Sequence, residues 1–407
     1  MQATSYVIKI RSDKASLFKG KKPVLSTLDL ELTERCNNNC IHCYINLPAK
    51  DAKAKERELS TARIKNILQE AASLGCLHVR LTGGEPLLRE DFEEIYQFAR
   101  RLGLKVILFT NATLITPRLA ALFSQIPPLE KIEISIYGMQ ATSYEAVTRV
   151  TGSYAAAWQG MNLLLEKKVP FVVKGAILPS NEKEMDRFKS WAAALPWMDR
   201  PPMCLTFFDL RCRRDSDKKN RRIQQLRLTP QKALKFLKKN TQYRNGMKLF
   251  CSKFTGPPGK SLFTCGSGIA SGCVDAYGYF QPCMLLRHPE TVYDLKTGTL
   301  KDGLLNFFPK VREKTATNSD YLARCAQCFL KGLCEQCPAK SWMENGTLDT
   351  PVDYLCAIAH AQAGYLGLLK RDETAWKVTD WGKRIMNFSG EEPTNAKEKQ
   401  AERSAAI

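Results

Sequence analysis

The chain has 407 residues, of which 44% are hydrophobic and 25% are charged, so it has the composition of a globular protein with two or three domains. Its 15 cysteines are an odd number, which argues against a framework of disulfides alone and favours metal or cluster ligation. No apolar run reaches membrane-spanning length, and the N-terminus lacks the apolar core of a signal peptide. We therefore expect a cytoplasmic protein without a membrane partner.

Strand-like runs alternate with helical patterns between residues 25 and 210. Strands are expected at 27–33, 78–82, 105–110, 131–136, 170–178 and 203–210. Helices are expected between them, at about 60–74, 91–103, 141–149, 154–167 and 183–194, and from about 116. Such βα units require a parallel sheet with right-handed crossovers, but six strands are too few for a closed barrel. The expected fold class is therefore α/β, an open partial (β/α)6 barrel with its chemistry at the C-terminal ends of the strands.

The rest of the chain is expected to divide by composition. The predicted domains are an extension at 1–24, the barrel at 25–210, a basic bridging segment at 211–260, a cysteine-rich domain at 261–360, and a C-terminal helix and tail at 361–407. The cysteine-rich domain is expected to contain a hairpin at 274–280, and a helix is expected at about 354–369. The bridging segment carries sixteen Lys or Arg against two Asp, with a helix at 229–239. It is either a solvated face or a docking surface for an acidic partner, and its few aromatic residues disfavour nucleic acid.

Three cysteines follow the first expected strand at the spacing CxxxCxxC, at Cys36, Cys40 and Cys43. Three thiolates can bind three irons of a four-iron cluster and leave the fourth iron open for chemistry. A structural zinc site, or three unrelated core cysteines, would fit the spacing equally well.

Polar and glycine residues follow the next expected strands. Gly83-Gly84-Glu85-Pro86 comes directly after the second strand, Asn111 after the third, and Ser135 lies near the end of the fourth. Because the C-terminal ends of parallel strands meet at one edge of the sheet, these residues and the cysteine loop are expected to form a single site.

Together, the CxxxCxxC and Gly-Gly-Glu-Pro motifs resemble those of the radical S-adenosylmethionine (SAM) enzymes, over roughly residues 25–210. The resemblance implies that Cys36, Cys40 and Cys43 hold a [4Fe–4S] cluster whose open iron binds SAM. Reductive cleavage of SAM would then give a 5′-deoxyadenosyl radical that abstracts hydrogen from the substrate. The residues implied to contact SAM are His42, Gly83, Gly84, Glu85, Pro86, Asn111, Ser135 and Arg149.

A second set of cysteines resembles the SPASM extension of radical SAM enzymes, over about residues 261–360. The resemblance implies one auxiliary [4Fe–4S] cluster on Cys265, Cys273, Cys283 and Cys337, and another on Cys325, Cys328, Cys334 and Cys356. Cys334 and Cys337 depart from the family pattern, because their spacing is CxxC where CxxxC is more usual. Three clusters in total are therefore expected, with two Cys₄ zinc sites as the alternative to the auxiliary pair.

The family resemblance implies a maturase that oxidatively modifies a peptide or protein, with a thioether or carbon–carbon crosslink as the product. The alternatives are a radical SAM enzyme acting on a small metabolite, formylglycine-type sulfatase maturation, and a non-enzymatic zinc scaffold. Met284 stands where the sulfatase-maturing branch has an Asp, which disfavours that branch. The expected partners are the peptide substrate and an electron donor such as flavodoxin or ferredoxin. No leader-peptide-binding domain is visible at the N-terminus, so a separate recognition protein, or docking on the basic segment, is also expected.

Overall fold

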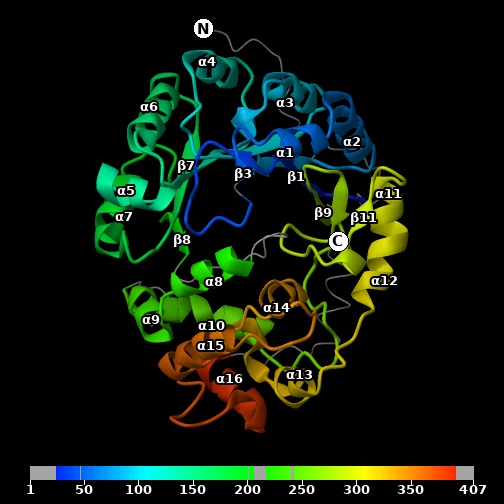
Figure 1. Ribbon diagram of the computed structural model, residues 1–407. Helices are drawn as coiled ribbons and strands as arrows, with labels where there is room; N and C mark the ends of the chain where they lie inside the picture. Colours follow the sequence, from blue (N-terminus) through cyan, green and yellow to red (C-terminus); the bar gives the residue numbers. More distant parts are fainter. Residues whose placement is uncertain (1–23, 46, 200, 206–216, 240–242, 391–407) are drawn as a thin grey trace. The chain divides into compact units, whose positions relative to one another are not determined.

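The fold is taken from a computed structural model, which describes residues 24–45, 47–199, 201–205, 217–239 and 243–390 (Figure 1). The chain forms two compact units. The first comprises Met1–Phe208, Arg221–Leu226 and Ser267–Pro309, and the second Asp209–Asn220, Arg227–Gly266 and Lys310–Ile407. None of the helices in the described residues has the length and apolar character needed to cross a membrane.

A nine-stranded sheet in the order β11-β10-β9-β1-β4-β5-β6-β7-β8 organises the first unit. Its parallel strands are β1 (Thr27–Thr33), β4 (His78–Gly83), β5 (Lys105–Thr110), β6 (Ile132–Ile136), β7 (Phe171–Ala176) and β8 (Met203–Leu205). These strands confirm the expected parallel sheet of six strands, although the predicted continuation of the last strand to 210 lies outside the described residues. Leu28, Val79 and Ile134 are fully buried, as alternate positions of a strand facing a helical layer should be.

Helices lie between successive strands and cover the outer face of the sheet (Figure 1). They are α1 (Ala52–Arg57), α2 (Thr61–Ser73), α3 (Phe92–Arg101), α4 (Pro117–Gln125), α5 (Ala141–Thr148), α6 (Ser153–Glu166) and α7 (Met185–Ala193). The side chains of Ser60 and Thr116 cap α2 and α4, which is why these helices begin where the sequence predicts. The architecture is the predicted partial barrel.

The predicted hairpin belongs to this same sheet. Strand β9 (Ser271–Val274) pairs in parallel with β1, and β10 (Tyr279–Gln281) and β11 (Tyr293–Asp294) continue the sheet in antiparallel fashion. Without β9, the outer edge of β1 would leave its backbone groups unpaired, so the hairpin completes the barrel edge. The structure therefore places residues 267–309 with the barrel, and not in a separate domain that begins at 261.

Helices and short turns make up the second unit and the segments that join it to the first. The helices are α8 (Asp217–Gln225), α9 (Pro230–Lys238), α10 (Tyr243–Phe254), α12 (Phe308–Arg312), α13 (Ser319–Ala323), α14 (Pro338–Asn345), α15 (Asp353–Leu366) and α16 (Trp381–Ser389). The short helix α11 (Leu300–Asp302) belongs to the first unit. Single-turn helices cover Cys325–Gln327, Phe329–Gly332 and Ala375–Lys377. The core of the second unit includes the buried side chains of Cys251, Phe329, Ala363 and Ile385. The predicted helices at 229–239 and 354–369 are α9 and α15.

Candidate active site and a four-cysteine pocket

The loop that carries Cys36, Cys40 and Cys43 is closed at its base. Two-residue strands, β2 (Arg35–Cys36) and β3 (Leu47–Pro48), pair in parallel and bring the two ends of the loop together. Farther along, the backbone N–H groups of Asn39 and Ile41 donate to the carbonyls of Thr148 and Val147, at 2.9 and 3.0 Å. The loop is therefore fixed both to the strand that precedes it and to the C-terminal end of α5.

The two glycines of the Gly-Gly-Glu-Pro turn lie against the backbone that precedes the cysteine loop. The N–H of Gly84 donates to the carbonyl of Thr33 at 2.7 Å, and the N–H of Glu85 donates to the carbonyl of Arg35 at 2.9 Å. A Cβ atom at Gly83 or Gly84 would overlap these same carbonyl oxygens, and Gly83 also has a φ of +133°. The turn therefore requires glycine for its contact with the strand that ends in Cys36.

The Glu85 side chain is fully buried. It accepts hydrogen bonds from the end of β5 and from the turn that follows Glu85 itself. Its carboxylate accepts from the hydroxyl of Thr110 at 2.8 Å, the N–H of Asn111 at 2.8 Å and the N–H of Leu87 at 3.1 Å. Burial raises the pKa of this carboxyl to about 7, although the three donors act to lower it. Pro86 is buried as well and begins a single helical turn, Pro86–Leu88. Glu85 thus holds the end of β5 to the turn after β4.

Asn111 connects this network to the first cysteine. Its side-chain amide donates to Asn37 Oδ1 at 3.0 Å and lies 3.8 Å from Cys36 Sγ. The N–H of Asn38 also donates to that sulfur, at 3.3 Å. Burial raises the pKa of the Cys36 thiol to about 12, and the nearby Glu85 and Cys43 act in the same direction. A cation bound to the sulfur would offset this cost, because coordination favours the thiolate.

Aromatic side chains surround the other two cysteines. The ring of His42 lies edge-on to Tyr137, with 4.9 Å between ring centroids. Burial raises the pKa of Tyr137, as do the adjacent Cys40 and Cys43. Sequence reasoning missed Tyr137, although it lies two residues after Ser135 and so on the same face of the chain.

Two observations in the described residues fit a group bound at this loop. Both side-chain polar atoms of Asn38, inside the loop, are buried without a hydrogen-bond partner in the part of the chain that the structure describes. The same holds for the buried hydroxyl of Tyr144, which interacts electrostatically with Cys40, Glu85 and Cys36. Buried polar groups are almost always paired, so these atoms point to a ligand.

Arg149 stands apart from the other predicted contacts. It is exposed at the C-terminal cap of α5 in a left-handed conformation, with φ 57°. Its backbone follows directly on Thr148, whose carbonyl holds the cysteine loop. The predicted role of its side chain in binding SAM stays a prediction.

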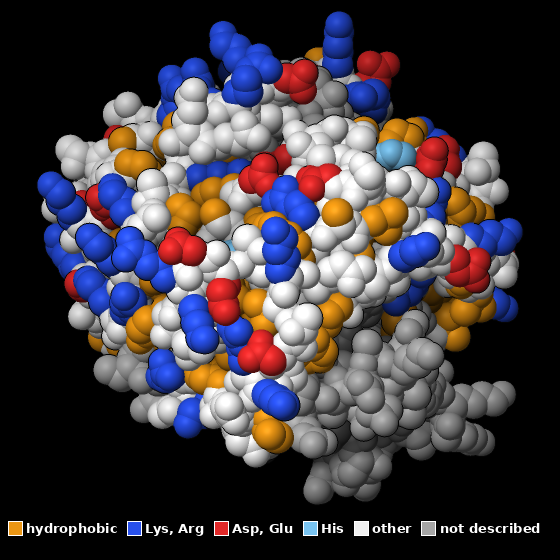
Figure 2. Space-filling model, turned by 90° about the horizontal axis from the view of Figure 1, so that it is seen from below, with side chains coloured by type: hydrophobic (Ala, Val, Ile, Leu, Met, Phe, Trp, Pro, Cys, Tyr) orange, Lys and Arg blue, Asp and Glu red, His pale blue; other side chains and the backbone are white. Residues whose placement is uncertain are grey.

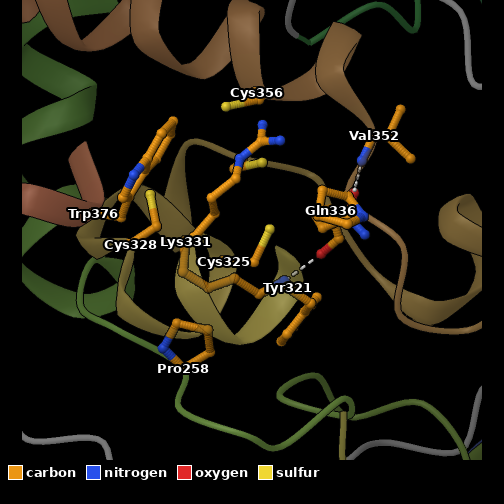
Figure 3. Close-up of a pocket in the computed structure, with 12 residues that line it drawn as sticks. Pro258, Tyr321, Cys325, Cys328, Lys331, Gln336, Val352, Cys356 and Trp376 are labelled. Atoms are coloured by element: carbon orange, nitrogen blue, oxygen red, sulfur yellow. Dashed lines mark hydrogen bonds between the residues drawn. The ribbon is translucent and has the colours of Figure 1, made fainter. Parts of the chain in front are cut away.

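Four of the C-terminal cysteines line one cavity in the second unit. Figure 3 shows the side chains of Cys325, Cys328 and Cys356 facing the same space, and Cys334 completes the set. Burial raises the pKa of Cys325 and Cys328 to about 12, and Cys334 and Cys356 add to the effect. The structure therefore brings together the four residues that the sequence assigns to one auxiliary cluster.

The other predicted set is divided between the two units. Cys273 on β9 and Cys283 belong to the first unit, whereas Cys265 and Cys337 belong to the second. Burial raises the pKa of Cys273 well above the usual range. The assignment of these four residues to one cluster stays a prediction. Within the described residues, no three His, Cys, Asp or Glu side chains are arranged to hold a single metal ion.

The chain is similar to known proteins over its first half. The profile of the Radical SAM superfamily matches residues 30–192. The AdoMet-dependent heme synthase of Methanosarcina barkeri is 31% identical over 157 residues, which are 39% of this chain and 44% of the synthase. The PqqA peptide cyclase of Rhodopseudomonas palustris is 35% identical over 153 residues, which are 37% of this chain and 39% of the cyclase. These matches span less than half the length of both curated relatives.

Similarity of fold extends over most of the chain. Streptococcus suis SuiB, solved with S-adenosylmethionine bound, superposes with a TM-score of 0.58 and 15% sequence identity. The superposition covers 84% of this chain and 80% of SuiB.

Proposed function

Because residues 30–192 form a radical SAM domain, as the two N-terminal motifs predicted, we propose that this protein is a radical SAM enzyme that oxidatively modifies a peptide or protein. The observation that carries the proposal is the cysteine loop, which β2, β3 and α5 fix beside the Glu85 network. A [4Fe–4S] cluster and SAM, when bound there, supply one-electron cleavage to a 5′-deoxyadenosyl radical that abstracts hydrogen.

The residues of the loop and of the strand ends have separate roles in this proposal. Cys36, Cys40 and Cys43 hold three irons, and Glu85 with Pro86 keeps the turn after β4 in place. Backbone groups of Gly83 and Gly84 face SAM, and the other side chains assigned to it are His42, Asn111, Ser135 and Arg149. The unpartnered Asn38 amide and Tyr144 hydroxyl lie in the same region and are added to this set.

Two auxiliary clusters complete the proposed set of three. One is bound by the four cysteines of the second-unit cavity, Cys325, Cys328, Cys334 and Cys356. The other is bound by Cys265, Cys273, Cys283 and Cys337. Electrons enter from a donor such as flavodoxin or ferredoxin.

A peptide substrate is supported by the PqqA peptide cyclase, whose name states that it acts on a peptide, and by the surface of α10. On this helix Leu249, Phe250 and Phe254 are 52%, 37% and 41% exposed, and Lys248 and Lys253 are exposed beside them. Figure 2 shows such a mixture on the face seen from below, with many Lys and Arg side chains, fewer Asp and Glu, and hydrophobic side chains between them. A segment that combines apolar and acidic side chains complements this surface.

A small-metabolite substrate is the second candidate, because the AdoMet-dependent heme synthase matches the same domain. Such a substrate needs no basic docking surface. Sulfatase maturation is disfavoured by Met284, for the reason given above.

Cleavage of SAM tests the reaction type. The protein, loaded anaerobically with iron and sulfide and then reduced, should convert SAM to 5′-deoxyadenosine. Cys40→Ala should abolish this product, whereas Cys76→Ala should retain it, because Cys76 is a buried cysteine beside β4 outside the predicted ligand sets. Full cleavage by Cys40→Ala would contradict the assignment of the loop.

Charge reversal on α10 tests the substrate class. Short peptides encoded beside the gene would be co-expressed with the enzyme and examined by mass spectrometry for a loss of two hydrogens per crosslink. Lys248→Glu combined with Lys253→Glu should reduce the modified fraction about tenfold or more, which corresponds to a loss of about 1.4 kcal/mol of docking free energy. Lys377→Glu, an exposed lysine elsewhere in the second unit, is the matched control. An unchanged fraction in the α10 variant would show that the peptide does not dock on α10, and an absence of modification in every candidate peptide would favour the small-metabolite alternative.

A further inference from the structure

The charged side chains that line the cavity of the four cysteines are all cations. Twelve described residues line it, and those with a charged side chain are Arg324 and Lys331, with no Asp or Glu among them. Four thiolates gathered in one cavity repel one another, so the site as built suits a group that brings positive charge to the sulfurs. Even with an iron–sulfur cluster bound, four thiolate ligands leave the assembly anionic.

Arg324 is held in place above this cavity. Its guanidinium lies 5.1 Å from the ring of Trp376, and it forms ion pairs with Asp320 at 3.0 Å and Asp353 at 2.8 Å. Both carboxylates are on the solvent side, with side chains 53% and 82% exposed, whereas the Arg324 side chain is 24% exposed. Arg324 also interacts electrostatically with the sulfur of Cys356. Its charge therefore acts directly on a predicted ligand.

Lys331 is the second cation that lines the cavity. Its ammonium donates to the carbonyl of Gln336, which fixes the side chain over the turn that contains the cysteines. In this position it interacts electrostatically with Cys325 and Cys334. Together the two cations reach three of the four sulfurs.

The remaining walls strengthen these interactions. Pro258, Pro351, Val352 and the ring of Trp376 give the cavity apolar sides, and electrostatic forces are larger where water is excluded.

We propose that Arg324 and Lys331 set a raised reduction potential for the iron–sulfur cluster bound by Cys325, Cys328, Cys334 and Cys356. The proposal rests on the function proposed above, because that function supplies the cluster. Reduction adds one electron and makes the anionic assembly more negative, so nearby fixed cations stabilise the reduced form relative to the oxidised form. The two residues are positioning residues, which act on the cluster through charge and not by ligation.

Potentiometric titration followed by electron paramagnetic resonance tests the proposal. The full chain would carry Cys36→Ala, Cys40→Ala and Cys43→Ala, be loaded with iron and sulfide, and be reduced stepwise with dithionite. The signal of the cavity is the one that Cys328→Ala removes. Because this background cannot cleave SAM, the measured potential is independent of the reaction proposed above.

In that background Arg324→Gln and Lys331→Gln should each lower the midpoint potential of this signal. For Arg324→Gln we expect a tenfold change in the one-electron equilibrium constant, which is about 59 mV. Arg324→Lys keeps the positive charge, so its midpoint potential should lie close to that of the unsubstituted Arg324 protein. A purely structural role of Arg324 would not predict this result. Arg384→Gln is the control, because Arg384 also pairs with two carboxylates in the second unit but does not line the cavity. Unchanged potentials in both Gln variants, or no signal that depends on Cys328, would overturn the proposal.

Discussion

The carboxylate of Glu85 accepts a hydrogen bond from the backbone N–H of Asn111 at 2.8 Å. Asn111 then donates through its side chain to Asn37, inside the cysteine loop. A buried acid after β4 thus orders the end of β5, and through it the first cysteine. Groups one contact away from a ligand commonly determine how well a metal site forms.

Glu85→Gln should therefore impair the loop without touching a cysteine. The amide cannot accept from three donors as the carboxylate does, so the positions of Asn111 and Cys36 loosen. We expect a 10–100-fold loss in the rate of SAM cleavage at equal protein concentration, with lower iron content. Glu93→Gln is the control, because Glu93 forms a surface ion pair with Arg118 at 2.8 Å. Wild-type cleavage and iron content in Glu85→Gln would show that the network is dispensable.

Gly84→Ala should disturb the same region from the backbone side. The new Cβ would overlap the carbonyl oxygen of Arg35, which cannot move without moving Cys36. Overpacking of this kind costs about 1–3 kcal/mol, so the thermal midpoint and the iron content should both fall. Gly246→Ala, in α10, has open space at its Cβ and should match or slightly exceed the wild-type midpoint. Equal midpoints for the two variants would contradict the close contact of Gly84.

The sequence predicted well the features that depend on local pattern. The six parallel strands and the helices between them followed from periodicity and capping residues such as Ser60, and the loops carrying Cys36, Gly84 and Asn111 converge as strand ends should. The four cysteines that the family resemblance assigns to one auxiliary cluster line one cavity, and their role as ligands stays a prediction.

The features that the sequence could not predict depend on long-range pairing. The sequence indicated the hairpin at 274–280, but nothing local to it indicates that β9 pairs with β1. This pairing is extended by the hydroxyl of Ser26, which donates to the carbonyl of Ala270 at 2.9 Å. The compact units accordingly differ from the domain expected at 261–360, because Ser267–Pro309 belongs with the barrel strands. The hydrogen bonds of the Glu85 carboxylate with Thr110 and Asn111 were not predicted, because donors supplied by β5 are not apparent in the motif itself. The expected contact of Glu85 with SAM stays a prediction.

Protonation of Glu373 at low pH should lower the stability of the second unit. Its hydrogen bonds with Arg384 lower the pKa of this carboxyl from 4.5 to about 2. A depressed carboxyl pKa contributes stability above the unfolded value and loses it as pH falls through the folded value, here between about pH 4.5 and 2. The contribution is small, because the pair lies at the surface and is partly exposed to solvent. Thermal midpoints of wild type and Glu373→Gln should therefore differ at pH 6 and converge towards pH 2, and a constant difference would contradict the assignment.

The buried Arg287 should be the costliest side chain to remove from the first unit. It forms ion pairs with Glu31 on β1 and, at 3.1 Å, with Glu34, and its side chain is 7% exposed. Arg287→Met leaves both acids buried without their cation, and breaking a buried pair from one side costs about 3–5 kcal/mol. The thermal midpoint should fall sharply, whereas Arg118→Met, which breaks a surface pair with Glu93, should cost about 0–1 kcal/mol. Adding Glu31→Gln to Arg287→Met should restore part of the loss, since it removes one of the two stranded charges. A double variant no more stable than Arg287→Met would show that Arg287 acts by packing and not by charge.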